Sequence, residues 1–235
     1  FYIARYGLLL TAKHVVDDIA QHDAESRPTL AWLWGTDGTL RFRPMLTCSF
    51  DSRAPREAAD IAICQVVDKA GEGEVRLLHP NERIALVTTL PPPRTRIATY
   101  AYPSNHRVDF AAPERTGTLF ADAFEGEVIE LIGPKDGFLR YPHMQTSIDV
   151  GFGASGGPVF GPGGHAFAVN CRGWELQDAE PLSSVVPVSQ ILDLQFPYPY
   201  IPTGSAEESA VPRNRRGGHV TLRELAAWGH VSVDP

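Results

Sequence analysis

The sequence predicts an all-β protein, folded as a sandwich or a barrel of short antiparallel strands. Short apolar runs recur along most of the chain, and turns rich in glycine, proline, serine and aspartate separate them. The 21 glycines and 20 prolines among 235 residues supply many such turns. The alternation of strand and helix patterns that indicates a parallel α/β sheet is absent. The length of 235 residues suits one large β domain or two small ones, and 43% hydrophobic residues are enough to form a packed core.

The N-terminal part of the chain is predicted to hold strands and one short helical stretch. Residues 60–67 alternate isoleucine with alanine and cysteine, which is the pattern of a strand buried on both faces. Residues 15–21 suit one or two helical turns. The other strands are expected at residues 1–4, 7–11, 29–34 and 40–45.

Three consecutive prolines at residues 91–93 form the clearest linker in the sequence. They fall about midway between His14 and Ser155, where a protein with two β domains needs a crossover. Beyond them, short strands are expected at residues 96–102, 107–110, 114–121, 126–132, 143–148, 158–160, 166–171 and 184–188.

The C-terminal region is predicted to be helical in two places. Residues 188–194 are expected to begin a closing helix, and the composition then shifts toward proline, glycine, serine and glutamate. The sequence Thr-Leu-Arg-Glu at residues 221–224 is a capping box, which predicts a short helix ending near Trp228. The basic cluster at residues 213–216 is expected to be a solvated tail, with a docking patch as the alternative.

Three motifs supply a nucleophile, a base and a carboxylate. Ser155 lies within Gly-Ala-Ser-Gly-Gly-Pro, an apolar strand leads into His14, and Asp60 opens another strand. A serine hydroxyl is a poor nucleophile at neutral pH, so it needs a base that a carboxylate holds in the right tautomer. His14 is the predicted base and Asp60 the predicted orienting group. Their order along the chain is that of the chymotrypsin-type triad.

Each motif also has an ordinary structural interpretation. His14 alone suits a histidine at a helix start, and residues 153–158 alone suit a glycine-rich turn. Asp60 competes with Asp51 and Glu57 for the role of the carboxylate. The agreement of three motifs favours the triad.

The nucleophile elbow of an α/β-hydrolase is a second way to use Ser155, with Asp193 and His219 as partners. Such an elbow must pass directly into a helix. The glycines and prolines of residues 156–164 prevent one, so the sequence argues against this fold.

The segments around His14, Asp60 and Ser155 resemble those of trypsin-like serine proteases, of the short bacterial branch that lacks disulfides. The resemblance implies a chymotrypsin-like fold of two six-stranded antiparallel β-barrels, with the active site in the cleft between them and a short C-terminal helical tail. The implied units are residues 1–90 with His14 and Asp60, residues 94–197 with Ser155, and a C-terminal extension at residues 198–235 with a short helix.

The resemblance implies a serine endopeptidase that hydrolyses peptide bonds through an acyl-enzyme. The backbone N–H groups of Gly153 and Ser155 would form its oxyanion hole. Ala154 replaces the aspartate that receives a freshly cut N-terminus in the animal enzymes, so activation by that route is not expected. A catalytically silent peptide-binding module on the same scaffold is the alternative function.

The resemblance also implies a set of substrate-binding residues. Asp149 would form the floor of the specificity pocket and select Arg or Lys, because a buried carboxylate favours a cationic partner. A shifted loop register, or neutralisation of Asp149 by Arg172, is the alternative. The pocket walls would come from Cys171, Arg172, Gly173 and Ser184, and the first three would offer backbone hydrogen bonds to an extended substrate.

Composition limits the expected partners. A net charge of −7 argues against a nucleic-acid footprint, and no stretch is long enough to span a membrane. We expect a protein or peptide substrate, no nucleic acid, no membrane, no cofactor and no metal, and leave open a regulatory partner or fused domain. The three cysteines, Cys48, Cys64 and Cys171, are too few and too scattered for a disulfide framework or a zinc site.

Cysteine usage also bears on localisation. Secreted trypsin-like enzymes usually carry a disulfide beside the catalytic histidine, whereas Ala12 and Lys13 precede His14 here. This favours a reducing compartment and predicts a cytoplasmic protein. The sequence starts at Phe1 without a methionine, which leaves an upstream signal peptide open.

Overall fold

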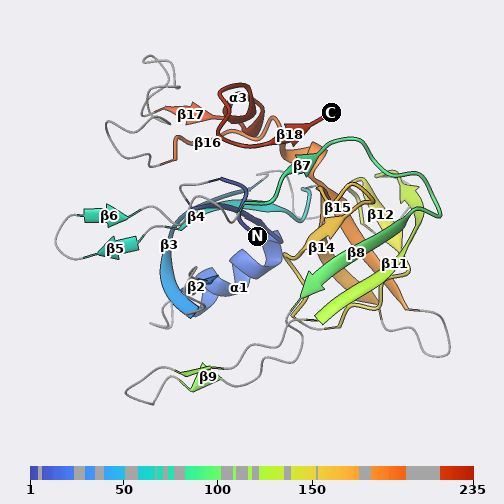
Figure 1. Ribbon diagram of the computed structural model, residues 1–235, viewed down its shortest axis with the longest axis horizontal. Helices are drawn as coiled ribbons and strands as arrows, with labels where there is room; N and C mark the ends of the chain where they lie inside the picture. Colours follow the sequence, from blue (N-terminus) through green and yellow to red (C-terminus); the bar gives the residue numbers. More distant parts are fainter. Residues whose placement is uncertain are drawn as a thin grey trace.

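The computed structural model is mostly β (Figure 1). It describes residues 1–4, 7–23, 30–34, 40–50, 58–66, 68–70, 74–76, 83–101, 108–109, 116–117, 122–134, 139–151, 153–174, 181–199 and 218–235. Within these ranges, no helix is long and apolar enough to cross a membrane.

The C-terminal half forms a closed six-stranded antiparallel barrel. Its strands run in the order β13-β8-β11-β12-β15-β14, and pairing of β13 with β14 closes the ring. Alternate residues point inward, so Ile97, Thr99 and Ala101 of β8 are buried while their neighbours are more exposed. The strands are β8 (Arg96–Ala101), β11 (Asp122–Ile132), β12 (His143–Thr146), β13 (Pro158–Phe160), β14 (Ala166–Trp174) and β15 (Leu182–Pro187).

The N-terminal half contains a four-stranded antiparallel sheet in the order β1-β4-β3-β2. Strand β4 is buried along its whole length, as its sequence pattern predicts. Of the expected strand at residues 1–4, the structure shows only an isolated bridge between Tyr2 and Leu9. A second complete barrel stays a prediction. The elements are β1 (Leu8–Thr11), α1 (Lys13–Asp23), β2 (Leu30–Trp34), β3 (Leu40–Phe50), β4 (Ala62–Val66), and the pair β5 (Asp68–Ala70) and β6 (Glu74–Arg76).

Between β8 and β11 lies a small ladder of β9 (Val108–Asp109) and β10 (Thr116–Gly117). The linker prolines at residues 91–93 lie between β7 (Leu86–Val87) and β8, and their role as a crossover between two domains stays a prediction. The closing helix expected at residues 188–194 is only a 3-10 turn, η1 (Val188–Ile191). Four residues at this turn bring Val188 and Ile191 into the core, so a longer helix is not needed to bury them.

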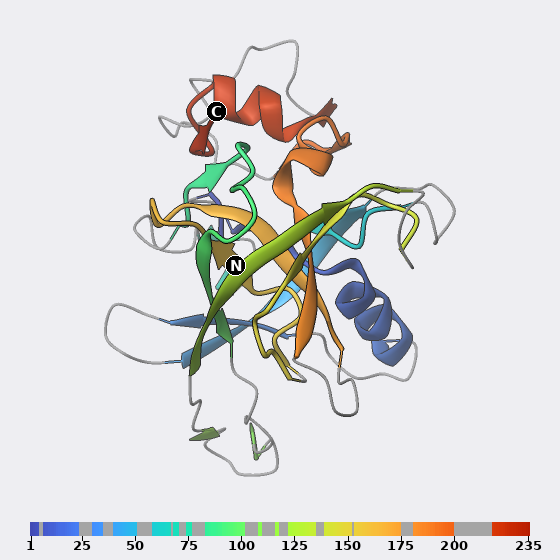
Figure 2. The same cartoon turned by 90° about the vertical axis from the view of Figure 1, so that its right-hand side faces the viewer.

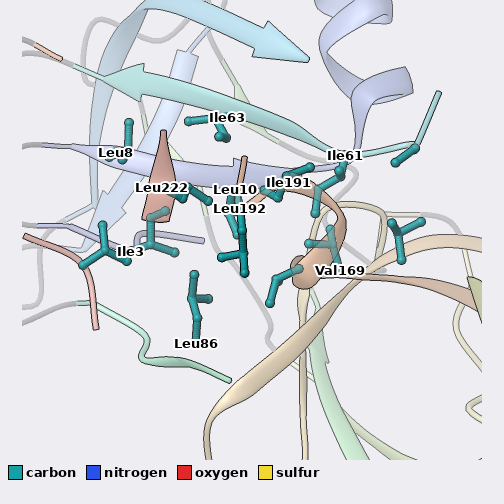
Figure 3. Close-up of a cluster of buried hydrophobic side chains, with 14 of the residues drawn as sticks. Ile3, Leu8, Leu10, Ile61, Ile63, Leu86, Val169, Ile191, Leu192 and Leu222 are labelled. Atoms are coloured by element: carbon teal, nitrogen blue, oxygen red, sulfur yellow. The ribbon is translucent and has the colours of Figure 1, made fainter. Parts of the chain in front are cut away.

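One hydrophobic cluster joins the two halves (Figure 3). Leu10 and Ile61 come from the N-terminal half, Val169 from β14 and Ile191 from η1, and each is at most 1% exposed. Burying such a side chain contributes about 1.5–3 kcal/mol to stability, so this cluster fixes the two halves against each other. The other labelled members are Ile3, Leu8, Ile63, Leu86, Leu192 and Leu222.

The described part of the C-terminal extension packs into the same core. Strand β16 (Phe196–Pro197) pairs with β17 (His219–Val220), and β18 (Val233–Asp234) pairs in parallel with β7. Helix α3 (Leu222–Ala227) begins at the predicted capping box, with Thr221 and Glu224 bonding each other's backbone N–H groups. Figures 1 and 2 both show α3 at one end of the molecule, next to β7 and β18. The basic cluster at residues 213–216 lies outside the described residues.

Candidate active site

His14 lies in the first turn of α1, directly after β1. The first N–H groups of a helix lack partners within it, and the His14 N–H donates to Asp60 Oδ1 at 2.9 Å. The ring Nδ1–H donates to the other oxygen, Asp60 Oδ2, at 2.7 Å. One carboxylate therefore fixes both the backbone and the imidazole of His14. This contact holds the tautomer that leaves Nε2 as a proton acceptor.

Sheet pairing explains why these two residues meet. Strands β1 and β4 are antiparallel neighbours, with Thr11 opposite Ala62. The segment after β1 and the segment before β4 therefore lie at the same edge of the sheet, and these segments carry His14 and Asp60. Asp51 and Glu57, the alternative carboxylates, lie outside the described residues.

Several charges act on the pKa of His14, which is raised above its ordinary value of 6.5. The hydrogen bond that His14 donates to Asp60 is the largest cause, partial burial opposes it, and the charges of Asp60 and Asp18 raise the pKa further. The positive charge of Arg172 lowers it. The side chain of His14 is 43% exposed, so solvent or a substrate reaches the ring.

The turn that carries Ser155 depends on glycine. Gly153 and Gly156 have φ angles of 91° and 85°, a region that residues with side chains rarely adopt. A Cβ on Gly156 would lie 2.3 Å from Thr11 Oγ1 and 3.2 Å from the N atom of Ala12. The residue after Ser155 therefore packs against the segment that leads into His14.

Cys171 contacts both parts of the site. The Ser155 hydroxyl donates to the Cys171 carbonyl oxygen at 3.4 Å, and Cys171 Sγ donates to the Asp60 carbonyl oxygen at 3.0 Å. Burial, followed by the charge of Asp60, raises the pKa of Cys171 well above its usual value, which keeps the thiol neutral. The structure thus brings His14, Asp60 and Ser155 to one site, although Ser155 is hydrogen-bonded to Cys171 and not to His14.

The predicted oxyanion-hole donors, the N–H groups of Gly153 and Ser155, differ from the two N–H groups that follow them. Within the described part of the chain, the N–H groups of Gly153 and Ser155 make no protein hydrogen bond. The next two N–H groups are used, because Gly156 donates to the Asn170 carbonyl at 2.8 Å and Gly157 donates to the Ala154 carbonyl at 3.0 Å. Ala154 itself is buried.

The predicted substrate-binding residues have mixed environments. Asp149 is exposed, between the buried residues Ile148 and Val150, so it lacks the burial expected of a pocket floor. That Asp149 selects Arg or Lys stays a prediction, and its exposure weakens the argument from a buried carboxylate. A Cβ on Gly173 would lie 2.3 Å from the Val150 carbonyl oxygen, so β14 runs against this loop.

The residues predicted to form the pocket walls lie on two neighbouring strands. Arg172 of β14 is exposed and stands opposite Ser184 of β15, which is buried. Cys171, which precedes Arg172 in β14, is also buried. The contact of Cys171 with Asp60 was not foreseen, because it depends on how the two halves pack. Asn170, a buried polar residue among the apolar residues of β14, is a signal of a functional or structural role that the sequence itself shows.

Comparison with solved structures identifies the fold. The crystal structure of Deg5 matches at 18% identity, covering 81% of this chain and 78% of that one, with a TM-score of 0.54. The MamO protease domain from Magnetospirillum magneticum, in its apo form, matches at 14% identity, covering 80% and 82%, with a TM-score of 0.50. No family model and no curated protein sequence matches the chain. At these identities the likeness concerns the fold: the chain has the chymotrypsin-like fold of trypsin-like serine proteases.

Proposed function

We propose that this protein is a serine endopeptidase with Ser155 as nucleophile, His14 as general base and Asp60 as orienting carboxylate. The observation that carries the proposal is the double hydrogen bond from His14 to Asp60, at 2.9 and 2.7 Å, beside the Ser155 turn. Such a bond serves a base that must gain and lose a proton at Nε2 while its Nδ1–H stays fixed.

The chemistry follows from the positions of these groups. A proton passes from Ser155 Oγ to His14 Nε2 as the oxygen attacks the substrate carbonyl carbon, and Asp60 stabilises the imidazolium. The unbonded N–H groups of Gly153 and Ser155 would receive the developing oxyanion. His14 then protonates the leaving amine, and water hydrolyses the acyl-enzyme by the reverse proton path.

The substrate is a protein or peptide bound in extended form along β14. Arg172 and Gly173 pair with β15, and the proposed substrate strand runs along this same stretch of β14. Ala154 is buried and has no carboxylate, so the proposed enzyme does not need a freshly cut N-terminus. We also propose a cytoplasmic location, since Ala12 and Lys13 stand beside His14 where secreted trypsin-like enzymes usually carry a disulfide.

A peptide-binding protein without turnover is the second candidate. The observation in its favour is that the Ser155 hydroxyl donates to the Cys171 carbonyl and not to His14. The 3.4 Å length of that bond is near the limit of a hydrogen bond, and catalytic contacts often tighten only when substrate is bound.

Cleavage of a peptide library separates the two candidates. We expect the wild-type protein to cut extended peptides and Ser155→Ala to lose activity by a factor of about 10⁴ or more. Retained binding of the same peptides by Ser155→Ala would show that the loss is chemical. Binding without any cleavage by the wild type would favour the second candidate.

A further inference from the structure

Asn170 makes a buried polar contact next to the proposed nucleophile. Its side chain is 2% exposed, and its Nδ2 donates to Thr99 Oγ1, which is 1% exposed. Thr99 Oγ1 in turn donates to the Pro158 carbonyl oxygen at 2.8 Å. This chain of two hydrogen bonds joins β14, β8 and the first residue of β13.

The backbone of Asn170 holds the same turn. Its carbonyl accepts from the Gly156 N–H at 2.8 Å, and its N–H donates to the Gly157 carbonyl at 2.9 Å. A Cβ on Gly157 would lie 3.4 Å from Asn170 Nδ2. Gly156 and Gly157 are therefore bonded to Asn170 directly, and Pro158 is linked to it through Thr99.

The side-chain contacts matter most at Pro158. Proline has no backbone N–H, so its carbonyl is its only backbone hydrogen-bonding group. The Thr99 hydroxyl donates to that carbonyl. The end of the turn is thus held by a side-chain hydroxyl in addition to the pairing of β13, and the amide of Asn170 bonds to this hydroxyl.

The arrangement also carries an energetic cost. Asn170 Oδ1 is buried and has no hydrogen-bond partner within the described part of the chain. An apolar side chain of similar size would avoid that cost and would keep the backbone bonds to Gly156 and Gly157. What only the amide supplies is the link through Thr99 to Pro158.

We propose that Asn170 and Thr99 are positioning residues that set the place of the Ser155 hydroxyl by holding residues 156–158. The proposal rests on the proposed role of Ser155 as nucleophile. Neither side chain touches the reacting atoms, so both act through the turn. Because a displacement of about 1 Å costs roughly a hundredfold in rate, loosening this turn slows acylation while leaving the substrate contacts of residues 171–173 in place.

The test is the rate at which a small uncharged fluorophosphonate modifies Ser155. We expect Thr99→Val and Asn170→Leu to lower the second-order rate constant by about ten- to a hundredfold. Thr99→Ser keeps the hydroxyl and should stay close to wild type. On a peptide substrate, kcat should fall with little change in KM.

Thr221→Ala is the matched control. It removes a hydroxyl that caps α3, far along the chain from this turn, and lowers stability without touching residues 153–158. We expect its labelling rate to equal that of the wild type. If Thr99→Val and Asn170→Leu lower the melting temperature but label at the wild-type rate, they are structural and the proposal is wrong.

Hydrogen exchange of the Gly156 amide provides a readout that needs no activity. Thr99→Val should speed this exchange relative to the wild type and to Thr221→Ala, because the bond to the Asn170 carbonyl opens more often. An unlabelled wild type would refute the proposed protease function, and the exchange rate would then decide the positioning role alone. Unchanged exchange at Gly156 in both Thr99→Val and Asn170→Leu would overturn it.

Discussion

The two sides of the candidate site are held in different ways. On the N-terminal side, charged side-chain contacts orient His14, with both oxygens of Asp60 bonded to it. On the C-terminal side, backbone geometry places Ser155, through two glycines with positive φ and hydrogen bonds from the turn to β14. The base should therefore respond to charge and pH, and the nucleophile to small changes in volume and backbone freedom.

The largest expected effect is that of Asp60→Asn, which removes the charge that orients His14 on the N-terminal side of the site. An amide in this place favours the wrong tautomer of His14, and turnover should fall by about 10⁴, the scale known for this change in the chymotrypsin-type triad. The kcat of the purified variant measures it. Asp18→Asn is the control: Asp18 acts on His14 through its charge alone, so the variant should keep most activity. A severe loss in Asp51→Asn or Glu57→Gln, with Asp60→Asn active, would mean that a different carboxylate orients His14.

Gly156→Ala tests the C-terminal side of the site, where backbone geometry places Ser155. Its Cβ would lie 2.3 Å from Thr11 Oγ1, at a φ of 85°, so the turn must move. A shift of about 1 Å should lower kcat roughly a hundredfold.

Gly164→Ala is the matched control for that change. Gly164 also has a positive φ, of 74°, but a Cβ there meets nothing within 4 Å. It carries a similar backbone strain of about 1–2 kcal/mol without a clash, so it should lose stability and keep its activity. Equal activity losses in the two variants would show that strain, and not the contact with Thr11, is responsible.

The pH dependence of kcat/KM tests the contact between His14 and Asp60 further, and its expected effect is smaller. Because Asp60 raises the pKa of His14, kcat/KM should rise with pH around a midpoint above 6.5, where the imidazole becomes neutral. The stabilising effect of the charged pair runs the opposite way. It is fully present below pH 6.5 and is lost as the pH rises through the raised folded-state pKa.

Removing the positive charge of Arg172 should shift that profile slightly. Arg172→Gln takes away a charge that lowers the pKa of His14, so the midpoint should move upward. Titration of the His14 ring by nuclear magnetic resonance measures the shift directly. A downward shift would contradict the placement of Arg172 beside His14.

The smallest effect is expected for Asp149→Asn. The Asp149 carboxylate is exposed, and ion pairs at exposed sites contribute little, so the cleavage profile should change little. Library profiling of both proteins measures this. A strong preference for Arg or Lys that disappears in the variant would show that Asp149 does select the substrate.

Local sequence patterns predicted the elements whose formation depends on residues close by in the sequence. The strand at residues 158–160 and the helix start at Thr221 appear where expected, since alternation and capping are local signals. The extent of β3 to Phe50 and the short turn at Val188 were missed, because strand pairing and core packing set them.

In the candidate site, too, some features follow from local sequence and others depend on packing. His14, Asp60 and Ser155 stand in recognisable motifs, and the structure brings their segments together. The exposure of Asp149 and the contact of Cys171 with Asp60 depend on loop direction and on the packing of two halves. No local pattern encodes these features, so the sequence alone could not predict them.

Mapping a covalent fluorophosphonate adduct by mass spectrometry tests the triad most directly. We predict one adduct, on Ser155, formed by the wild-type protein at neutral pH, absent from Ser155→Ala and slowed by about 10⁴ or more in His14→Ala. Folding of each variant is checked by its melting curve. An adduct on another residue, or equal labelling of Ser155 in the wild type and His14→Ala, would contradict the proposed triad.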